Sequence, residues 1–417
     1  MLSHMSSSSL SRRAVVGAAL SGAAVMAMPG LAQAAGRAPG PRPPHRPVPS
    51  VPTTPSAHPT PPVPVPPLNV PALRAAIGDL EHPQLTAAQV RVSGSAGRWY
   101  GTAGVADRDT GRAVQARDTF RIGSITKVFV ATVVLQLAAE GRVAVESPIQ
   151  RRLPGLLPAG YPPITVLQLL NHTSGLPDEE GAPDLSTPEA IARHRYDRWT
   201  PRQLVALLPP GPMKFTPGRK QEYRGINYVL LALLIERLTG RPYGEVVADR
   251  ILRPLGLHHT CVPGNDPRIH GPHVHGYMKM TDGSLLDITD FDQSEAWGEG
   301  EMISTTGDLD RFLTALFSGE LLPPRELDRM FTLPPEEVRM LDGTPARYAA
   351  GLQTVTVNGI TFWGKTGERF GYASAMVATR DQQRRAVLSF NPVRRDATQV
   401  QATLRLADAL TKPPSGR

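Results

Sequence analysis

Ser124 and Lys127 are the first residues whose types and spacing suggest chemistry. They stand at the start of an apolar segment, Ile125 to Glu140, which predicts a helix ended by Gly141. Side chains three residues apart share a helix face, so the hydroxyl and the amine are expected to meet. Burial favours the neutral form of a lysine, which can then take the proton of a serine nucleophile. The pair predicts covalent catalysis; the alternative is a helix-cap serine beside a surface lysine.

A second lysine stands in Gly364-Lys365-Thr366-Gly367, which the pattern places at the end of a strand. Lys365 can hold an anionic group, and the Thr366 hydroxyl can hydrogen-bond to a carbonyl or carboxylate. Gly367 lets another backbone approach closely. The alternative is a strand-end turn. The chain has six lysines among 45 basic residues, and arginine cannot replace a lysine base because it stays protonated.

Ser-x-x-Lys followed far downstream by Lys-Thr-Gly resembles the serine β-lactamases and penicillin-binding proteins. Nearly all of residues 75 to 395 resembles the class C β-lactamase and DD-carboxypeptidase branch of that family. The resemblance rests on Arg121-Ile122-Gly123-Ser124-Ile125-Thr126-Lys127, Gly104-Val105-Ala106-Asp107, Leu169-Leu170-Asn171-His172-Thr173-Ser174-Gly175-Leu176-Pro177, Pro254-Leu255-Gly256-Leu257, His273-Val274-His275-Gly276-Tyr277 and Ile303-Ser304-Thr305. It implies a β-lactamase/transpeptidase-like α/β fold without a cofactor.

The resemblance also implies roles for single residues. Tyr223 matches the tyrosine of the family's Tyr-x-Asn motif and is expected to pass a proton to the leaving group. The motif asparagine is replaced by Gly225, and Asn227 follows two residues later. The backbone N–H groups of Ser124 and Glu368 are implied to form the oxyanion hole. Substrate-binding roles are implied for Lys365, Thr366, Gly367 and Trp297.

Three acidic residues suggest a preference for neutral or cationic leaving groups. Glu368 stands where the branch that trims D-alanyl peptides often has a threonine, and Arg369 follows it. Glu299 and Glu301 stand where relatives carry small residues near the pocket rim. Free carboxylates would be repelled by such a site unless Arg369 neutralised it, so esters and amides are the expected substrates. The alternative is that these glutamates face solvent.

The only cysteine and the histidines around it point to structural roles. Cys261 has no partner for a disulfide, and we expect a small buried side chain. Zinc needs three or four convergent ligands, and the nearby His273 and His275 belong to a segment that resembles a structural part of the family. We predict no metal site. His172 is expected to be a structural hydrogen-bonding residue.

The charge balance is basic, with a formal net charge of +8 and a pI of about 9.8. The basic residues are scattered without a run of five or more, which indicates solvated surface charge and no nucleic-acid partner. Such a surface could favour contact with an anionic cell envelope.

The first 67 residues predict export. Residues 1–35 contain a pair of arginines, Arg12-Arg13, an apolar run and Ala32-Gln33-Ala34, which together predict a cleaved signal peptide of twin-arginine or general-secretion type. Residues 36–67 include 14 prolines and predict an extended linker, either a spacer through the cell wall or a tail without a specific role. We expect a secreted protein without a membrane span after signal cleavage.

The folded domain is expected over residues 68–412. Strands are predicted at Val90–Ser95, Trp99–Ala106, Ala349–Val357, Ile360–Gly364, Ala373–Thr379 and Arg385–Phe390. Further helices are predicted at Pro201–Leu208, Ile226–Thr239, Tyr243–Leu252, Thr306–Phe317 and Ala397–Leu410. Short connections favour an antiparallel sheet whose first strands pair with its last, flanked by helices and carrying a mostly helical insertion.

These patterns predict an exported serine hydrolase that forms an acyl-Ser124 intermediate on a small-molecule or peptide substrate. A D-alanyl-D-alanine carboxypeptidase-like peptidase is the leading interpretation. Esterase, D-amino-peptidase or amidase, and β-lactamase activities are alternatives within the same family. A non-catalytic envelope protein that binds penicillin or peptidoglycan is a further alternative, suggested by the loss of the motif asparagine at Gly225. The protein is expected to be a monomer.

Overall fold

The computed structural model describes residues 64–396 and 398–414. The predicted signal peptide and all but the last four residues of the predicted linker lie outside the described residues. Within them, no helix is both long enough and apolar enough to cross a membrane.

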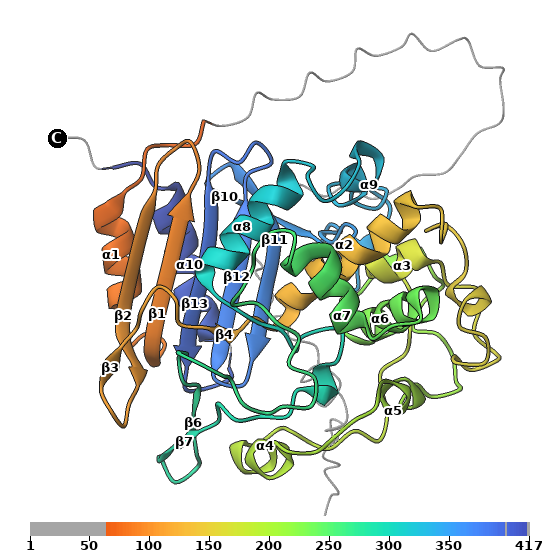
Figure 1. Cartoon of the computed structure of the whole chain (residues 1–417), viewed down its shortest axis with the longest axis horizontal. Coiled ribbons are helices and arrows are strands. Elements are labelled where there is room, and N and C mark those ends of the chain that lie inside the picture. The colour runs from red at the N-terminus through yellow and green to blue at the C-terminus, as the bar shows by residue number, and fades with distance from the viewer. Residues whose placement is uncertain (1–63, 397, 415–417) are drawn as a thin grey trace, which may run out of the picture.

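A seven-stranded sheet forms one side of the molecule (Figure 1). All its pairings are antiparallel, and β1 pairs with β13 so that Val90 faces Leu388. The predicted pairing of first and last strands is therefore confirmed. In spatial order the strands are β10 (Gln353–Val357), β11 (Ile360–Arg369), β12 (Tyr372–Ala378), β13 (Arg385–Pro392), β1 (Leu85–Ser93), β2 (Trp99–Asp107) and β3 (Arg112–Ala113).

Helices cover both faces of the sheet. The terminal helices α1 (Val70–Gly78) and α10 (Gln399–Thr411) pack together on one face and bury an apolar cluster that includes Leu73, Val90 and Leu406. On the other face α8 (Thr306–Phe317) packs against β1, β12 and β13. The sheet is thus enclosed between two apolar layers, which is how a sheet with two apolar faces avoids water.

The remaining helices form a helical region beside the sheet (Figure 1). Its centre is α2 (Thr126–Ala139), which is buried on nearly all sides and packs against α6 (Ile226–Thr239). The two helices belong to the main apolar core, whose members include Phe129, Val133 and Leu230. The other helices of this region are α3 (Val166–Leu170), α4 (Pro188–His194), α5 (Pro201–Ala206), α7 (Tyr243–Val247) and α9 (Pro324–Arg329).

Short strand pairs tie the helical region together. Two are antiparallel and one is parallel: β4 (Phe120–Arg121) with β8 (Ile303–Ser304), β6 (Tyr277–Lys279) with β7 (Leu285–Asp287), and β5 (Lys220–Gln221) with β9 (Arg339–Met340). The first pair matters for the site, because β4 leads directly into the turn that carries Ser124.

Several predicted boundaries need correction. The first strand begins at Leu85, five residues before the predicted start, because its alanines pack in the sheet without the β-branched pattern that marks a strand. The strand predicted from Ala349 begins at Gln353, since Gly351 has a φ of 90° that breaks the extended chain. The predicted Tyr243–Leu252 helix is α-helical only to Val247 and then continues as a π-helical turn. The predicted Ile226–Thr239 and Thr306–Phe317 helices are confirmed.

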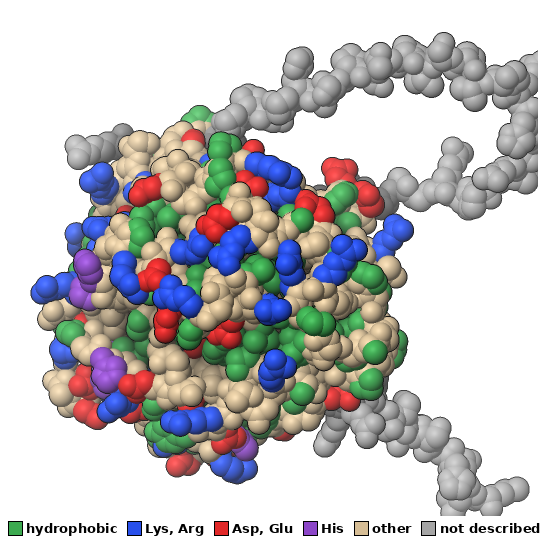
Figure 2. All heavy atoms as spheres, turned by 45° about the vertical axis from the view of Figure 1, so that its right-hand side comes forward, with side chains coloured by type: hydrophobic (Ala, Val, Ile, Leu, Met, Phe, Trp, Pro, Cys, Tyr) green, Lys and Arg blue, Asp and Glu red, His purple; other side chains and the backbone are tan. Residues whose placement is uncertain are grey.

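Charged side chains are interspersed on the molecular surface. Figure 2 shows Lys and Arg side chains scattered among Asp and Glu on the face turned to the viewer, without one continuous region of either sign. Many pair with each other, as Arg250 does with Glu140 and Lys214 with Glu222. The basic balance on this face is therefore a distributed surface charge.

Candidate active site

Ser124 lies in a 3₁₀ turn, Gly123–Ile125, between β4 and α2. Gly123 has a φ of 51°, a conformation that glycine adopts without a steric penalty. A Cβ atom there would lie 2.4 Å from the backbone nitrogen of Glu368 on β11. The turn can therefore lie directly on the strand, which brings the Ser124 backbone next to that of Glu368.

Two side chains contact the Ser124 hydroxyl. The Lys127 amine, one turn along on α2, lies 3.1 Å from Ser124 Oγ. The Tyr223 hydroxyl donates to the same oxygen at 2.7 Å. Lys127 and Tyr223 are buried, whereas Ser124 is partly exposed. The predicted trio is thus brought together, with a base candidate and a proton donor on one nucleophile candidate.

Glu299 completes the surroundings of Lys127. The Lys127 amine donates to the backbone oxygen of Glu299 at 2.7 Å and forms an ion pair with its carboxylate. The Lys127 side chain is fully buried, while the Glu299 side chain is 19% exposed. Glu299 therefore joins the catalytic centre to the surface. The sequence predicts its place at the pocket rim but gives no sign of its contact with Lys127.

Gly225 explains how a glutamate reaches this place. A Cβ atom on Gly225 would lie 2.4 to 2.5 Å from the carboxylate atoms of Glu299. The motif asparagine is therefore missing from the space that the Glu299 carboxylate fills. Asn227 does not substitute for it, because its amide bonds to Ser174 and lies beside His172 in the interior. Gly225 and Glu299 are therefore coupled through the same space.

Lys365 lies on the other side of Tyr223. Its amine is 4.5 Å from the centre of the Tyr223 ring and donates to Gln353 Oε1 and to the Thr366 carbonyl. Thr366 is half-buried beside it. The motif was predicted at the end of a strand, but β11 continues through it to Arg369. β11 packs against the turn that carries Ser124, and Lys365 lies beside Tyr223, whose hydroxyl contacts Ser124.

Gly367 allows β11 to meet the Ser124 turn. A Cβ atom on Gly367 would lie 1.9 Å from the carbonyl oxygen of Ile122, so no larger residue fits. Ser374 of β12 donates to that same carbonyl at 3.0 Å. The carboxylate of Glu368 forms an ion pair with Arg395 at 2.6 Å. Its backbone is left beside Gly123, as an oxyanion hole with Ser124 requires.

Burial changes the proton affinity of these groups. Desolvation lowers the pKa of Lys127, and the nearby Glu299 carboxylate opposes that effect. Burial, with the nearby Lys127 cation, holds the pKa of Lys365 well below its ordinary value. Burial and Glu299 together hold the pKa of Tyr223 well above 10. Tyr223 is therefore neutral at physiological pH and able to donate a proton.

His172 packs against the tyrosine. Its ring lies 4.5 Å from that of Tyr223, and Nδ1 accepts from the backbone N–H of Arg224. Burial holds the pKa of His172 well below its ordinary value, so the ring is neutral. These contacts are those of a structural residue that supports Tyr223.

The structure places three predicted residues elsewhere. Trp297 packs edge-on against Tyr243 and lines a separate recess with Cys261. Glu301 is fully buried and accepts a hydrogen bond from Tyr243, so it neither lines the pocket rim nor faces solvent. Cys261 is exposed, not buried as predicted: its backbone pairs with the buried Ile303, and its side chain lines that recess. The sequence offers no signal for these placements, which depend on how residues 296–303 turn.

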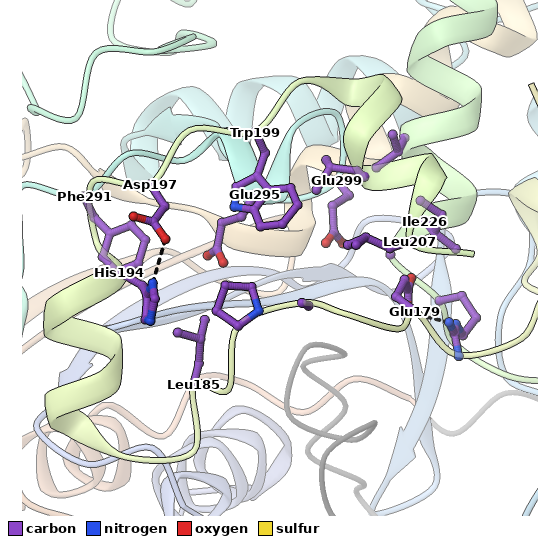
Figure 3. A pocket seen from close by; sticks show the side chains of 16 residues that line it. Glu179, Leu185, His194, Asp197, Trp199, Leu207, Ile226, Phe291, Glu295 and Glu299 are labelled. Atoms are coloured by element: carbon purple, nitrogen blue, oxygen red, sulfur yellow. Dashed lines mark hydrogen bonds and ion pairs between the residues drawn. The ribbon is translucent and has the colours of Figure 1, made fainter. Parts of the chain in front are cut away.

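A pocket opens on the Gly225 side of the catalytic centre (Figure 3). Its empty volume is about 850 Å³, including its open mouth. The carboxyl groups of Glu295 and Glu299 project into the same space in Figure 3. Apolar side chains form most of the remaining wall: Leu185, Trp199, Leu204, Leu207, Ile226, Val229 and Phe291. Glu295 is ion-paired with Arg369, as Glu299 is with Lys127, so the pocket combines ion-paired carboxylates with a broad apolar surface.

Sequence reasoning missed most of this pocket. Trp199, Leu185 and His194 come from the segment between α3 and α5, which carries no catalytic motif. In the described residues, no three His, Cys, Asp or Glu side chains are arranged to hold a metal ion.

The fold is that of the β-lactamase/transpeptidase-like proteins, a family of serine hydrolases. The chain belongs to the Beta-lactamase family, whose family model matches residues 73–411. A solved D-stereospecific amidohydrolase from Streptomyces sp. is 34% identical with a TM-score of 0.71, and the match covers 82% of this chain and 98% of that one.

Curated relatives have different names. Penicillin-binding protein 4* of Bacillus subtilis (strain 168) is 26% identical over 320 residues, which cover 73% of this chain and 67% of that protein. Esterase EstB of Burkholderia gladioli is 32% identical over 194 residues, 43% of this chain and 48% of that protein. The match to EstB thus spans about half of its length. The relatives agree on the family and differ in the activity that their names describe.

Proposed function

We propose that this protein hydrolyses amides or esters of D-amino acids that carry a free ammonium group and an apolar side chain. The observation that supports this substrate class is the Glu299 carboxylate, which fills the space beside Gly225 and lines a largely apolar pocket. A carboxylate there can pair with an ammonium group, and the apolar wall can take the side chain. The similarity to the D-stereospecific amidohydrolase favours the same class.

In this proposal Ser124 Oγ attacks the carbonyl carbon while the neutral Lys127 amine, 3.1 Å away, takes its proton. The backbone N–H groups of Ser124 and Glu368 stabilise the oxyanion. As the C–N or C–O bond breaks, Tyr223 relays the proton to the leaving group. Water then attacks the acyl-serine ester by the reverse sequence of proton transfers and releases the D-amino acid.

A D-alanyl-D-alanine carboxypeptidase-like activity is the second candidate. A terminal carboxylate could bind to Lys365, whose amine lies over the Tyr223 ring, and to Thr366 beside it on β11, and the similarity to penicillin-binding protein 4* supports this activity. We also propose that the protein is exported, because residues 1–35 have the features of a signal peptide.

One assay separates these activities. D-phenylalanine amide, L-phenylalanine amide, an N-acylated peptide ending in D-Ala-D-Ala, and a p-nitrophenyl ester are each incubated with the wild type and with Ser124→Ala. We expect turnover of the D-amide above that of the L-amide and the peptide, and no turnover by the variant. Preferred cleavage of the peptide would favour the carboxypeptidase. Binding of penicillin without turnover of any substrate would favour the non-catalytic alternative.

A further inference from the structure

We propose that the ion pair with Glu299 keeps Lys127 protonated and inactive as a base until the ammonium group of the substrate pairs with the Glu299 carboxylate instead. We call this ion pair the charge lock. The inference deepens the proposed function and rests on its substrate class. It makes Glu299 both a positioning residue for Lys127 and a determinant of specificity. A substrate without a positive charge would leave the lock closed.

The first argument is the hydrogen bonding of Lys127. Its amine contacts Ser124 Oγ, the backbone oxygen of Glu299 and the carboxylate of Glu299. A protonated ammonium has three N–H donors, and these three contacts can take all of them. The Ser124 hydroxyl fits either form, since it can accept from an ammonium or donate to a neutral amine. The Glu299 carboxylate is the contact that favours a protonated Lys127, because its negative charge stabilises the cation, and a protonated Lys127 cannot accept the Ser124 proton.

The second argument is access to Glu299. Its carboxylate lies where a side chain at Gly225 would lie, and both residues line the pocket. Lys127 is fully buried behind it. A ligand that enters the pocket can therefore meet the carboxylate on one side while Lys127 holds it on the other.

The third argument is the balance of charge around Lys127. With the ammonium of the substrate on Glu299, the favourable field that keeps Lys127 protonated is neutralised, and burial then favours the neutral amine. Lys127 releases its extra proton to water and can take the Ser124 proton as the Oγ–C bond forms. The titratable and charged groups that face Lys127 are His172, Tyr223, Tyr228, Glu299, Tyr348, Lys365 and Arg369. Glu299 is the only carboxylate among these groups.

The test uses a pair of substrates that differ only in the presence of the α-ammonium group. D-phenylalanine amide carries the ammonium group, and 3-phenylpropanamide has the same skeleton without it. The variant is Glu299→Gln, which keeps the shape and removes the charge. The control is Glu222→Gln, which also loses a lysine ion pair and has a similarly exposed side chain, 22% against 19%, but whose carboxylate neither contacts Lys127 nor lines the pocket.

We expect the wild type and Glu222→Gln to prefer the cationic amide by tenfold or more in kcat/KM, about the effect of one charge-assisted contact. In Glu299→Gln the preference should fall to within about threefold, and kcat for the neutral amide should rise. An unchanged preference would overturn the proposal, as would equal losses on both amides. If Glu299→Gln is slower on the cationic amide and no faster on the neutral one, Glu299 only binds the substrate, and this result would also overturn the proposal.

A second readout is independent of the substrate. The rate at which a neutral fluorophosphonate modifies Ser124 is measured against pH. Removing Glu299 lowers the pKa of Lys127, so the acidic limb of this profile should move to lower pH in Glu299→Gln and stay in place in Glu222→Gln. An acidic limb at the same pH in Glu299→Gln as in the wild type would refute the proposal. If neither amide is hydrolysed while the limb moves, the proposed substrate class fails and the lock stands.

Discussion

At the scale of single residues, Gly225 and Glu299 share one space in the candidate catalytic centre. Gly225 lacks the side chain of the motif asparagine, and the Glu299 carboxylate fills its place. A negative charge therefore lies beside Lys127. That charge raises the proton affinity of Lys127 and, in the proposed function, favours a cationic ligand.

Gly225→Ala tests this coupling directly. The backbone of Gly225 has a φ of −64°, so alanine is compatible with it, and only the contact with Glu299 is disturbed. A carboxylate at the end of a flexible side chain can move, so we expect a stability change within about 1 kcal/mol and a loss of the cationic preference. Denaturant unfolding measures the stability change, and kcat/KM for D-phenylalanine amide and 3-phenylpropanamide measures the cationic preference. Gly211→Ala, at a position with open space, is the control.

Tyr223→Phe removes only the hydroxyl that donates to Ser124 Oγ. We expect kcat to fall by about 10²- to 10⁴-fold, the usual contribution of a positioned proton donor. Stability should change little, since the aromatic contacts with His172 and Tyr348 remain. Steady-state kinetics on the best substrate check this result. Tyr161→Phe, whose hydroxyl bonds to Pro209, should keep its activity, and a Tyr223→Phe enzyme as active as this control would contradict the role.

At the scale of elements, the site is the meeting of one turn and one strand. The turn that carries Ser124 follows β4, and β11 supplies Lys365, Gly367 and Glu368. Glycines on both sides, Gly123 and Gly367, let the two backbones touch. Catalytic geometry therefore depends on backbone contact, which side-chain substitutions elsewhere on these elements leave intact.

Gly367→Ala should separate the turn from the strand. Its Cβ would lie 1.9 Å from the Ile122 carbonyl, and neither backbone can move without its neighbours. We expect a loss of about 1 to 3 kcal/mol of stability from overpacking and a fall of about 10²- to 10³-fold in kcat from a misplaced oxyanion donor. Thermal unfolding and kinetics measure the two effects. Gly160→Ala, with nothing near its Cβ, should change neither; a fully active Gly367→Ala enzyme would exclude the close contact.

At the scale of the whole molecule, an acid far inside the fold links stability to pH. Glu301 is fully buried, and desolvation raises its pKa from 4.5 to about 7. One carboxylate oxygen accepts from Tyr243 and from the Gly298 N–H, and within the described chain the other has no hydrogen-bond partner. The folded state therefore prefers the protonated acid.

The direction in which stability changes with pH follows from this preference. A carboxyl whose pKa is higher in the folded state stabilises the fold when it is protonated, and that stability is lost as pH rises from about 4.5 through 7. The loss amounts to roughly 3 kcal/mol. Glu301→Gln, which mimics the protonated acid, should be more stable relative to the wild type at pH 8 than at pH 5. Urea unfolding at both pH values measures the difference, and parallel pH dependences would disprove the assignment.

Much of the molecule was predictable from local patterns. The helices over Ile226–Thr239 and Thr306–Phe317 have continuous helix-forming segments with clear ends, and the pairing of first and last strands follows from their order. Ser124, Lys127 and Tyr223 belong to short motifs whose spacing the sequence displays. Local spacing determines a helix face, so the approach of Lys127 to Ser124 could be expected from the sequence by itself.

Only the tertiary structure decided what surrounds that pair. Glu299 is 172 residues from Lys127, and nothing in its own segment distinguishes it from Glu301, which is buried against Tyr243 instead. Trp297 and Cys261 likewise turn to a recess away from the site. The physical reason is that these contacts arise between backbone segments packed from distant parts of the chain. The space beside Gly225 can be interpreted only when the side chain that fills it, that of Glu299, is known.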